Sequence, residues 1–393
     1  MRTSHPHCKP ALLLALCAAL AAACSDGGDA PTPAAADDAS ADATADAAAD
    51  ATPDVAPDTP EDTGPPAPVV VALFDDARIT SDPSAENFQK VRAGFEVPTG
   101  PWASATLVVD LRSTCYPFEQ WRDDPPPAGH NWPASCDAFD RNFEFIMDEP
   151  TADGQPPGLE VVRAITPFGG PLHLEVDMTD LANAQPGAHQ MKAQISTWGD
   201  GSGRVSGANG GWNVSARLEL VAGPAPPIPI AVLPLFDGSV GDTATWEPLR
   251  FELPEGTVRA KVEYRTTGHG GARDTSCIGP AEEFCERTHR LTADGASLAS
   301  VVPWRDDCES LCTLEQGGPF GSTLEYCKEN PCGAISSVRA PRANWCPGSI
   351  TPPMTLEPSR WNTPGPHEFR FQVYGIKPGG SWRTSVVVFA YAE

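Results

Sequence analysis

Side chains suited to chemistry are concentrated between Gly268 and Gly348. This stretch holds seven of the twelve cysteines of the chain, together with acidic, basic and aromatic residues. Glu283 stands two residues before a cysteine, and Arg342 stands three residues before Trp345. Disulfides in a loop-rich region fix polar side chains that a free loop would leave mobile. The stretch is therefore expected either to build a polar site or to be a stapled loop region without one.

Two short segments of this stretch have a recognisable order of residues. They are Ala281-Glu282-Glu283-Phe284-Cys285 and Arg342-Ala343-Asn344-Trp345-Cys346-Pro347-Gly348. Both resemble the C-terminal half of the peptide-N-glycosidase F family, bacterial amidases that cut asparagine-linked glycans from proteins. The second segment agrees with the family's Arg-Ala-Gly-Trp-Cys-Pro-Gly pattern at every position except Asn344. It is the more specific of the two matches.

The N-terminal half carries further segments of the same family in the same order. Cys136-Asp137-Ala138-Phe139-Asp140-Arg141 resembles the family's Cys-Asp-Glu-Trp-Asp-Arg. The segments 163–168 (Arg-Ala-Ile-Thr-Pro-Phe) and 174–180 (Leu-Glu-Val-Asp-Met-Thr-Asp) match family segments that follow it. Matches in one order from about residue 70 to residue 390 indicate a relationship over the whole ordered part of the chain.

The resemblance implies two eight-stranded jelly-roll domains lying side by side, with an active site in the cleft between them. It makes Asp140 the carboxylate that activates water and Glu283 the second carboxylate across the cleft. Arg342 is expected to hydrogen-bond the sugar or the amide oxygen. Hydrolysis of an amide needs a base for water and donors for the developing oxyanion, so no metal or cofactor is required. The other expected substrate contacts are Arg141, Ser196, Trp198, His269 and Trp345.

Three features of the chain depart from the family pattern. Ser196 stands where the family carries a third acid, Ala138 replaces a family glutamate, and the loop from Cys115 to Cys136 is longer. These changes keep a second hypothesis open, a surface-anchored lipoprotein of the same fold that binds glycans without cutting them. Without the resemblance, Asp140 beside Arg141 is typical of a surface ion pair.

A third class of function is disfavoured by the histidines. The same two-domain fold is shared with copper-dependent, ascorbate-using monooxygenases, whose sites need clusters of histidine and a methionine ligand. Beyond the first 24 residues the histidines are spread along the chain without a closely spaced pair, at His130, His173, His189, His269, His289 and His367.

The hydrophobic pattern predicts an all-β fold of two sandwiches. Short β-branched or alternating segments are separated by Pro and Gly clusters, and long apolar stretches of helical period are absent from the sequence. The ordered part is expected to begin near residues 69–74, and the predicted strands are 105–111, 143–147, 172–176, 190–197, 213–221, 230–236, 259–266, 368–374 and 384–391. The proline-rich segment 223–229 lies between two runs of comparable length. We therefore predict an N-terminal sandwich over residues 69–225 and a C-terminal one over residues 226–393.

The first 68 residues predict export and a tether. Residues 1–24 combine early basic residues with a short apolar run that ends before Cys24, which is typical of a lipoprotein signal peptide with a lipidated cysteine. Residues 25–68 are rich in Ala, Asp and Pro, contain ten Asp, and have no Lys or Arg, so a disordered linker is expected. We expect an exported bacterial lipoprotein at the outer membrane or cell surface, attached to the membrane only through its lipid.

The net charge limits the classes of partner that the protein can bind. The formal net charge is −25, and the part beyond the linker is still acidic, which argues against nucleic acid as a partner. The expected partners are N-glycoproteins or glycopeptides, and the protein is expected to be a monomer.

Nine cysteines follow the predicted lipidation site, and an exported chain is expected to pair them. Spacing suggests Cys115 with Cys136 and Cys277 with Cys285. Cys346 is left to pair with Cys308 or Cys327, and the odd count predicts one free thiol. A zinc site is a competing, disfavoured hypothesis for the set Cys308, Cys312, Cys327 and Cys332.

Overall fold

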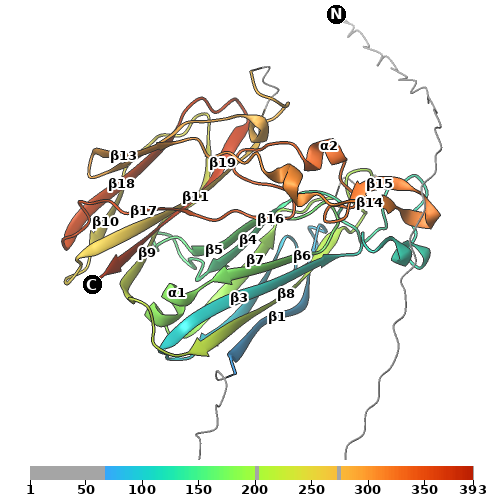
Figure 1. Ribbon diagram of the computed structural model, residues 1–393. Coiled ribbons are helices and arrows are strands. Elements are labelled where there is room, and N and C mark those ends of the chain that lie inside the picture. The colour runs from blue at the N-terminus through green and yellow to red at the C-terminus, as the bar shows by residue number, and fades with distance from the viewer. Residues whose placement is uncertain (1–66, 200–202, 272–275, 393) are drawn as a thin grey trace, which may run out of the picture. The chain divides into compact units, whose positions relative to one another are not determined.

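The computed structural model describes residues 67–199, 203–271 and 276–392 (Figure 1). The predicted signal peptide with Cys24, and nearly all of the predicted linker, lie outside the described residues. Within them the chain forms four antiparallel sheets and one short two-stranded ribbon. Among these residues no helix has the length and apolar character needed to span a membrane. The all-β prediction is confirmed.

The first two sheets form a sandwich from strands that begin with β1. One sheet has the order β1 (Val69–Thr80), β8 (Gly211–Ala222), β3 (Trp102–Ser113) and β6 (Leu172–Asp177). The other has the order β16 (Ser349–Ile350), β5 (Leu159–Ile165), β4 (Asn142–Met147), β7 (Gly187–Ile195) and β2 (Lys90–Val97). Period-two alternation explains the packing of β3. Its residues Leu107, Val109 and Leu111 are buried in the core, while Asp110 and Arg112 between and after them are exposed.

The other two sheets form a second sandwich from β9 onward. One has the order β17 (Met354–Leu356), β11 (Arg259–Gly270), β19 (Gly380–Tyr391) and β9 (Pro229–Gly241). The other has the order β10 (Leu249–Leu253), β18 (Gly365–Val373), β12 (His289–Ala293) and β13 (Ala296–Val301). Val262, Tyr264 and Phe369 are among the residues of its core. Apart from β16 and the ribbon, the described residues thus supply eight strands to each sandwich, as predicted.

Hydrogen bonds from two enclosed arginines join the two sandwiches. Arg383 on β19 donates from Nε and Nη2 to the carboxylate of Glu144 on β4, with both distances 2.9 Å. Arg265 on β11 donates from Nη1 to the carbonyl oxygen of Glu160 on β5 at 2.8 Å. In addition β16, which comes late in the chain, pairs with β5, and Figure 1 shows it beside that strand. Enclosed charges need a charged or hydrogen-bonding partner, and here the partners lie on the opposite sandwich, so these contacts fix one sandwich against the other.

The cysteine-rich segment between β13 and β17 holds little regular structure. It contains the ribbon β14 (Leu314–Gly317) and β15 (Leu324–Cys327) and the short helix α2 (Ile335–Val338). The disulfides are Cys115–Cys136, Cys277–Cys285, Cys308–Cys346 and Cys312–Cys327.

The two pairings suggested by spacing are confirmed, and Cys346 takes Cys308 of its two possible partners. Cys332 is the one free thiol of the described residues, as the odd count predicted. The zinc hypothesis is wrong, because three of its four proposed ligands are held in disulfides.

Candidate active site

Asp140 lies on a short turn that leads from the Cys115–Cys136 disulfide into β4. Its side chain is only 18% exposed. The turn is held by the buried carboxylate of Asp137, which accepts hydrogen bonds from Nε and Nη2 of Arg141 at 3.1 and 3.0 Å and from the hydroxyl of Thr197. Arg141 is therefore paired with Asp137, and the surface ion pair between Asp140 and Arg141 is not formed. The carboxylate of Asp140 is left to face the other sandwich.

Glu283 reaches the same place from the second sandwich. It lies in the 3₁₀ turn Glu282–Phe284, which is closed by the Cys277–Cys285 disulfide. Nη1 of Arg342 donates to Oε1 of Glu283 at 2.9 Å, while Nη2 of Arg342 lies 3.9 Å from Oδ2 of Asp140. One guanidinium thus lies against both of the predicted carboxylates.

Arg342 is almost completely enclosed, with 1% of its side chain exposed. Its Nη2 donates to the carbonyl oxygen and the hydroxyl of Ser337 at 2.7 and 3.0 Å. The guanidinium carbon lies 4.7 Å from the ring centre of Phe284 and 4.5 Å from that of Trp345. The backbone of Arg342 also exchanges two hydrogen bonds of 2.9 Å with Arg305. These contacts position the charge to act on the two carboxylates.

A pocket of about 180 Å³ opens between the two carboxylates. Its lining residues are Asp140, Arg141, Asn142, Ile165, Ser196, His269, Glu283 and Trp345. Six of the eight residues predicted to be catalytic or to contact substrate therefore line one pocket. Of the other two, Arg342 is enclosed behind the carboxylates. Trp198 is 48% exposed, and its ring lies 5.1 Å from the guanidinium carbon of Arg141.

Trp345 was expected to contact substrate. Only 2% of it is exposed. Its ring is in contact with Arg342 and stacks on His269 at 5.5 Å between ring centres, and its Nε1 donates to the carbonyl oxygen of Gly268 at 2.9 Å. The ring that remains accessible for stacking in this region is that of Trp198, while Trp345 fixes Arg342 and His269.

Burial and neighbouring charge set the protonation of the pocket. Burial raises the pKa of Asp140 to about 7, opposed by the charge of Arg342 and assisted by that of Glu283. Burial also raises the pKa of Glu283, again opposed by Arg342. For His269, burial and the nearby arginines lower the pKa to about 3, so the imidazole is neutral. Near neutral pH the site therefore offers a carboxylate that can take up a proton and a neutral ring that can hydrogen-bond.

Asn344, the one mismatch in the second C-terminal segment, lies in the left-handed region with φ of 66°. Glycine adopts this conformation freely, and asparagine is among the residues that tolerate it best. The side chain of Asn344 also donates to the carbonyl oxygen of Thr266 at 2.8 Å. The departure from the family pattern therefore preserves the local backbone.

Asp137 and Ser337 were not predicted as parts of the site. Asp137 lies inside a matched segment, four residues before Arg141, and that spacing was the available signal. The sequence offered no signal for Ser337, because Ser337 contacts Arg342 from a segment whose disulfide pairing could not be decided from the sequence.

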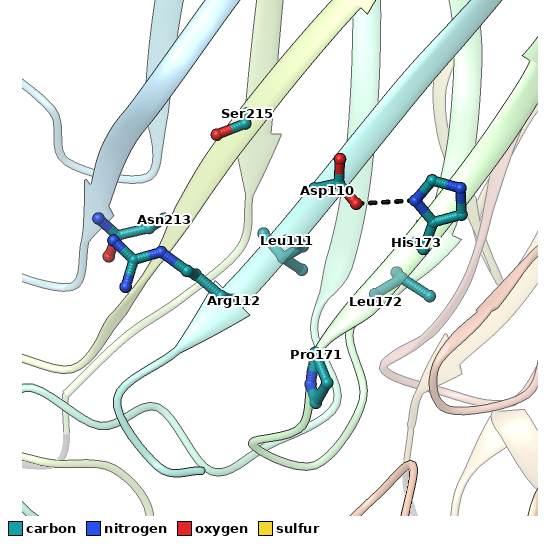
Figure 2. A pocket seen from close by; sticks show the side chains of 8 residues that line it. All are labelled: Asp110, Leu111, Arg112, Pro171, Leu172, His173, Asn213 and Ser215. Atoms are coloured by element: carbon teal, nitrogen blue, oxygen red, sulfur yellow. Dashed lines mark hydrogen bonds and ion pairs between the residues drawn. The ribbon is translucent and has the colours of Figure 1, made fainter. Parts of the chain in front are cut away.

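A larger hollow of about 420 Å³ lies elsewhere, on β3, β6 and β8 (Figure 2). It contains none of the predicted site residues. Figure 2 shows Asp110 and His173 facing one another, with Oδ1 and Nδ1 2.7 Å apart. Both side chains are more than half exposed. An open, exposed ion pair of this kind does not enclose a ligand.

Comparisons with known proteins bear on the family resemblance and on the fold. A family model described as peptide-N-glycosidase F, C terminal, matches residues 240–391. The peptide-N(4)-(N-acetyl-β-D-glucosaminyl)asparagine amidase F of Elizabethkingia miricola is 26% identical over 259 residues, which are 61% of this chain and 64% of that protein. The match thus spans less than two thirds of the relative's length.

Solved structures share the fold. A crystal structure of peptide-N(4)-(N-acetyl-β-D-glucosaminyl)asparagine amidase has a TM-score of 0.61 at 18% identity and covers 83% of this chain and 96% of its own. The PNGase F structure from Flavobacterium meningosepticum has the same TM-score at 19% identity, with the same coverage. A structure of PNGF-II has a TM-score of 0.61 at 18% identity and covers 82% of this chain and 65% of its own. The resemblance predicted from the motifs is confirmed: the chain is similar to peptide-N-glycosidase F over residues 240–391 and shares the fold of its solved structures.

Proposed function

We propose that the protein hydrolyses the amide bond between an asparagine side chain and an N-linked glycan. The observation that carries the proposal is the placement of Asp140 and Glu283, from different sandwiches, against one buried arginine and one small polar pocket. The name of the E. miricola relative gives this activity for that protein. The conclusion for this chain rests on its own carboxylates.

In the proposed reaction, ionised Asp140 takes a proton from water, which attacks the carbonyl carbon of the asparagine side chain. The carbon–nitrogen bond then breaks as Asp140 passes this proton to the leaving nitrogen, which leaves aspartate in the peptide and an amino sugar at the end of the glycan. Arg141 lines the pocket and supplies a positive charge near the developing oxyanion. Glu283 lies on the opposite wall and hydrogen-bonds the sugar or the attacking water. Arg342 is enclosed, so it acts by holding Asp140 and Glu283 rather than by touching substrate.

A glycan-binding protein without hydrolytic activity is the second candidate. The observation that favours it is Ser196, an uncharged side chain on the pocket wall where the family carries an acid. Together with the exposed ring of Trp198, it provides hydroxyl and stacking contacts for a sugar. This candidate predicts glycan binding with no change in the glycopeptide.

The two candidates are separated by incubating the chain with a denatured N-glycosylated protein and measuring peptide masses. The amidase proposal expects the glycan to be released and each glycosylated asparagine to become aspartate. Glycan binding that leaves every glycopeptide intact would establish the second candidate instead.

The pH dependence of the reaction follows from the state of Asp140. Because a general base must be ionised and the pKa of Asp140 is raised to about 7, kcat/KM should rise with pH through about 7. Below about pH 6 it should fall by roughly tenfold per pH unit. The measurement is kcat/KM on one glycopeptide between pH 4 and pH 9. An activity that stays constant down to pH 5 would rule out Asp140 as the base.

For the cellular location we propose export and lipid attachment at Cys24. The proposal rests on the basic start, the short apolar run and the small residues before this cysteine. The N-terminal peptide of protein purified from a bacterial membrane fraction should begin at Cys24 and carry the mass of acyl chains. A mature N-terminus at another residue would contradict it. We also propose that the protein acts as a monomer on N-glycoproteins or glycopeptides, which the mass of the purified protein in solution tests.

A further inference from the structure

Glu282, the neighbour of Glu283, is a buried acid that the proposed reaction does not use. Only 1% of the residue is exposed. Its Oε1 accepts from Nε of Arg287 at 2.7 Å and from Nε1 of Trp382 at 3.0 Å. Its Oε2 accepts from Nη2 of Arg287 at 2.9 Å and from the backbone N–H of Lys377 at 3.3 Å. Each carboxylate oxygen therefore has two N–H donors.

The backbone of the second sandwich leaves room for this carboxylate. A Cβ atom on Gly380 would lie 3.1 Å from Cβ and Cγ of Glu282, and one on Gly271 would lie 3.4 Å from its Cβ. Trp382 belongs to β19, so the side chain of Glu282 ties its turn to a central strand of the sheet. Burying a carboxylate costs several kcal/mol unless its partners are well placed. Glu282 has such partners, because four N–H groups donate to its carboxylate and the two glycines leave space for its side chain.

The turn that Glu282 fixes carries the site. Glu283 bonds Arg342, and Phe284 lies against the face of the same guanidinium. The carbonyl oxygen of Glu283 also accepts from the backbone N–H of Ala343, at 2.7 Å, next to Arg342 in the chain. A shift of the turn therefore moves Glu283 and Arg342 together.

Trp382 also packs close to the segment that carries Arg342. A Cβ atom on Gly268 would lie 2.7 Å from Cβ of Ala343 and 3.0 Å from the ring of Trp382, so Gly268 is packed between them. The indole that Glu282 holds thus lies close behind the Arg342 loop. One buried carboxylate supports both the second acid of the site and the arginine that joins the two acids.

We propose that Glu282 is a positioning residue, which holds the turn Glu282–Phe284 so that Glu283 and Arg342 face Asp140 in the geometry needed for hydrolysis. The role rests on the proposed amidase function and adds a residue to its machinery. Glu282 touches neither the pocket nor the substrate. Its effect is on the rate of the chemical step, because misplacement of a reacting group by about 1 Å costs on the order of 100-fold.

The test is Glu282→Gln, which keeps the shape of the side chain. Because each carboxylate oxygen accepts from two donors, either orientation of the glutamine amide directs its NH₂ group at two N–H donors. We expect kcat to fall by about 10- to 100-fold and KM on the same glycopeptide to change by less than about threefold. Arg287→Lys removes the planar guanidinium that donates to both oxygens of Glu282. This variant should also lower kcat, by a smaller factor.

Asp294→Asn is the matched control. Asp294 is a partly buried acid in the turn between β12 and β13, where its oxygens lie 3.0 Å from Nδ1 of His367 and from the backbone N of Glu368. Its φ of 48° suits asparagine. The control should lower the melting temperature while leaving kcat within about twofold. If Glu282→Gln also loses melting temperature but keeps kcat within about twofold, Glu282 is a structural staple and the proposal is wrong.

Hydrogen exchange separates a failure of this inference from a failure of the proposed function. In Glu282→Gln the amide of Ala343, which bonds Glu283, should exchange at least about tenfold faster, while the amide of Glu368 is unchanged. This readout does not need activity. If the wild-type chain releases no glycan, the amidase proposal fails, and faster exchange at Ala343 still supports the control of the turn by Glu282. Unchanged exchange at Ala343 overturns the positioning role whether or not the chain is active.

Discussion

Replacing Asp140 with asparagine should reduce kcat/KM by at least about 1,000-fold, because the amide cannot take a proton from water. The variant should nevertheless be more stable than the wild type above pH 7. In the folded protein the pKa of Asp140 is raised to about 7, so its ionised form is disfavoured relative to the unfolded chain. That penalty is absent below about pH 4, builds up between pH 4 and pH 7, and is complete above pH 7.

Removing the carboxylate should therefore raise the free energy of unfolding at pH 8 by on the order of 2 kcal/mol, a value reduced for the partial exposure of the side chain. At pH 4 the two proteins should differ little. Asp110→Asn, in the exposed hollow of Figure 2, is the control and should change neither activity nor stability appreciably. Thermal unfolding at both pH values and glycopeptide kinetics check the prediction. An Asp140→Asn variant that keeps its activity, or that loses stability at pH 8, would contradict it.

Replacing Arg342 with lysine should lower kcat/KM by about 100- to 1,000-fold and destabilise the fold by about 2–4 kcal/mol. Lysine keeps the charge but loses the planar fork that serves Glu283 and Ser337 together. It also loses the contacts that the guanidinium makes with the rings of Phe284 and Trp345. Two partly buried acids would then lack their shared partner.

The same substitution should also shift the pH profile of kcat/KM in a defined direction. The charge of Arg342 lowers the pKa of Asp140, so weakening that contact should raise the pKa and move the acid limb of kcat/KM to higher pH. Arg339→Lys, at the end of α2, is a suitable control, because Arg339 pairs at 3.6 Å with the exposed Glu309. Wild-type kinetics in Arg342→Lys would show that the guanidinium does not organise the two acids.

Strands with a regular alternation, such as β3 and β8, were predictable from the sequence, whereas β5, which packs against the other sandwich, was not. In β3 and β8 one face enters the core and the other faces outward, so the sequence alternates. All seven residues of β5 are buried, including Glu160 and Arg163. Its charges are paired with one another and with β11 and β19 across the sandwich contact. A strand whose charges are buried in pairs has no alternation to detect.

The residues of the candidate site likewise divide into those that could be predicted from the sequence and those that could not. Asp140 and Glu283 were predictable because each lies in a short segment that matches a family pattern. The burial of Arg342 and its bond to Ser337 depend on a segment held by two disulfides whose partners the spacing left open. The role of Glu282 depends on Trp382, which is a hundred residues away in sequence. Contacts of that range are set by the packed fold and leave no local signal.

The most direct test of the central claim is hydrolysis of a purified N-glycopeptide in ¹⁸O-labelled water, followed by mass analysis of the peptide. If Asp140 activates water for attack on the asparagine amide, the product peptide carries aspartate with one labelled oxygen, and the Asp140→Asn variant yields none. Release of the glycan with a sugar still attached to asparagine, or without label in the peptide, would contradict the proposed reaction.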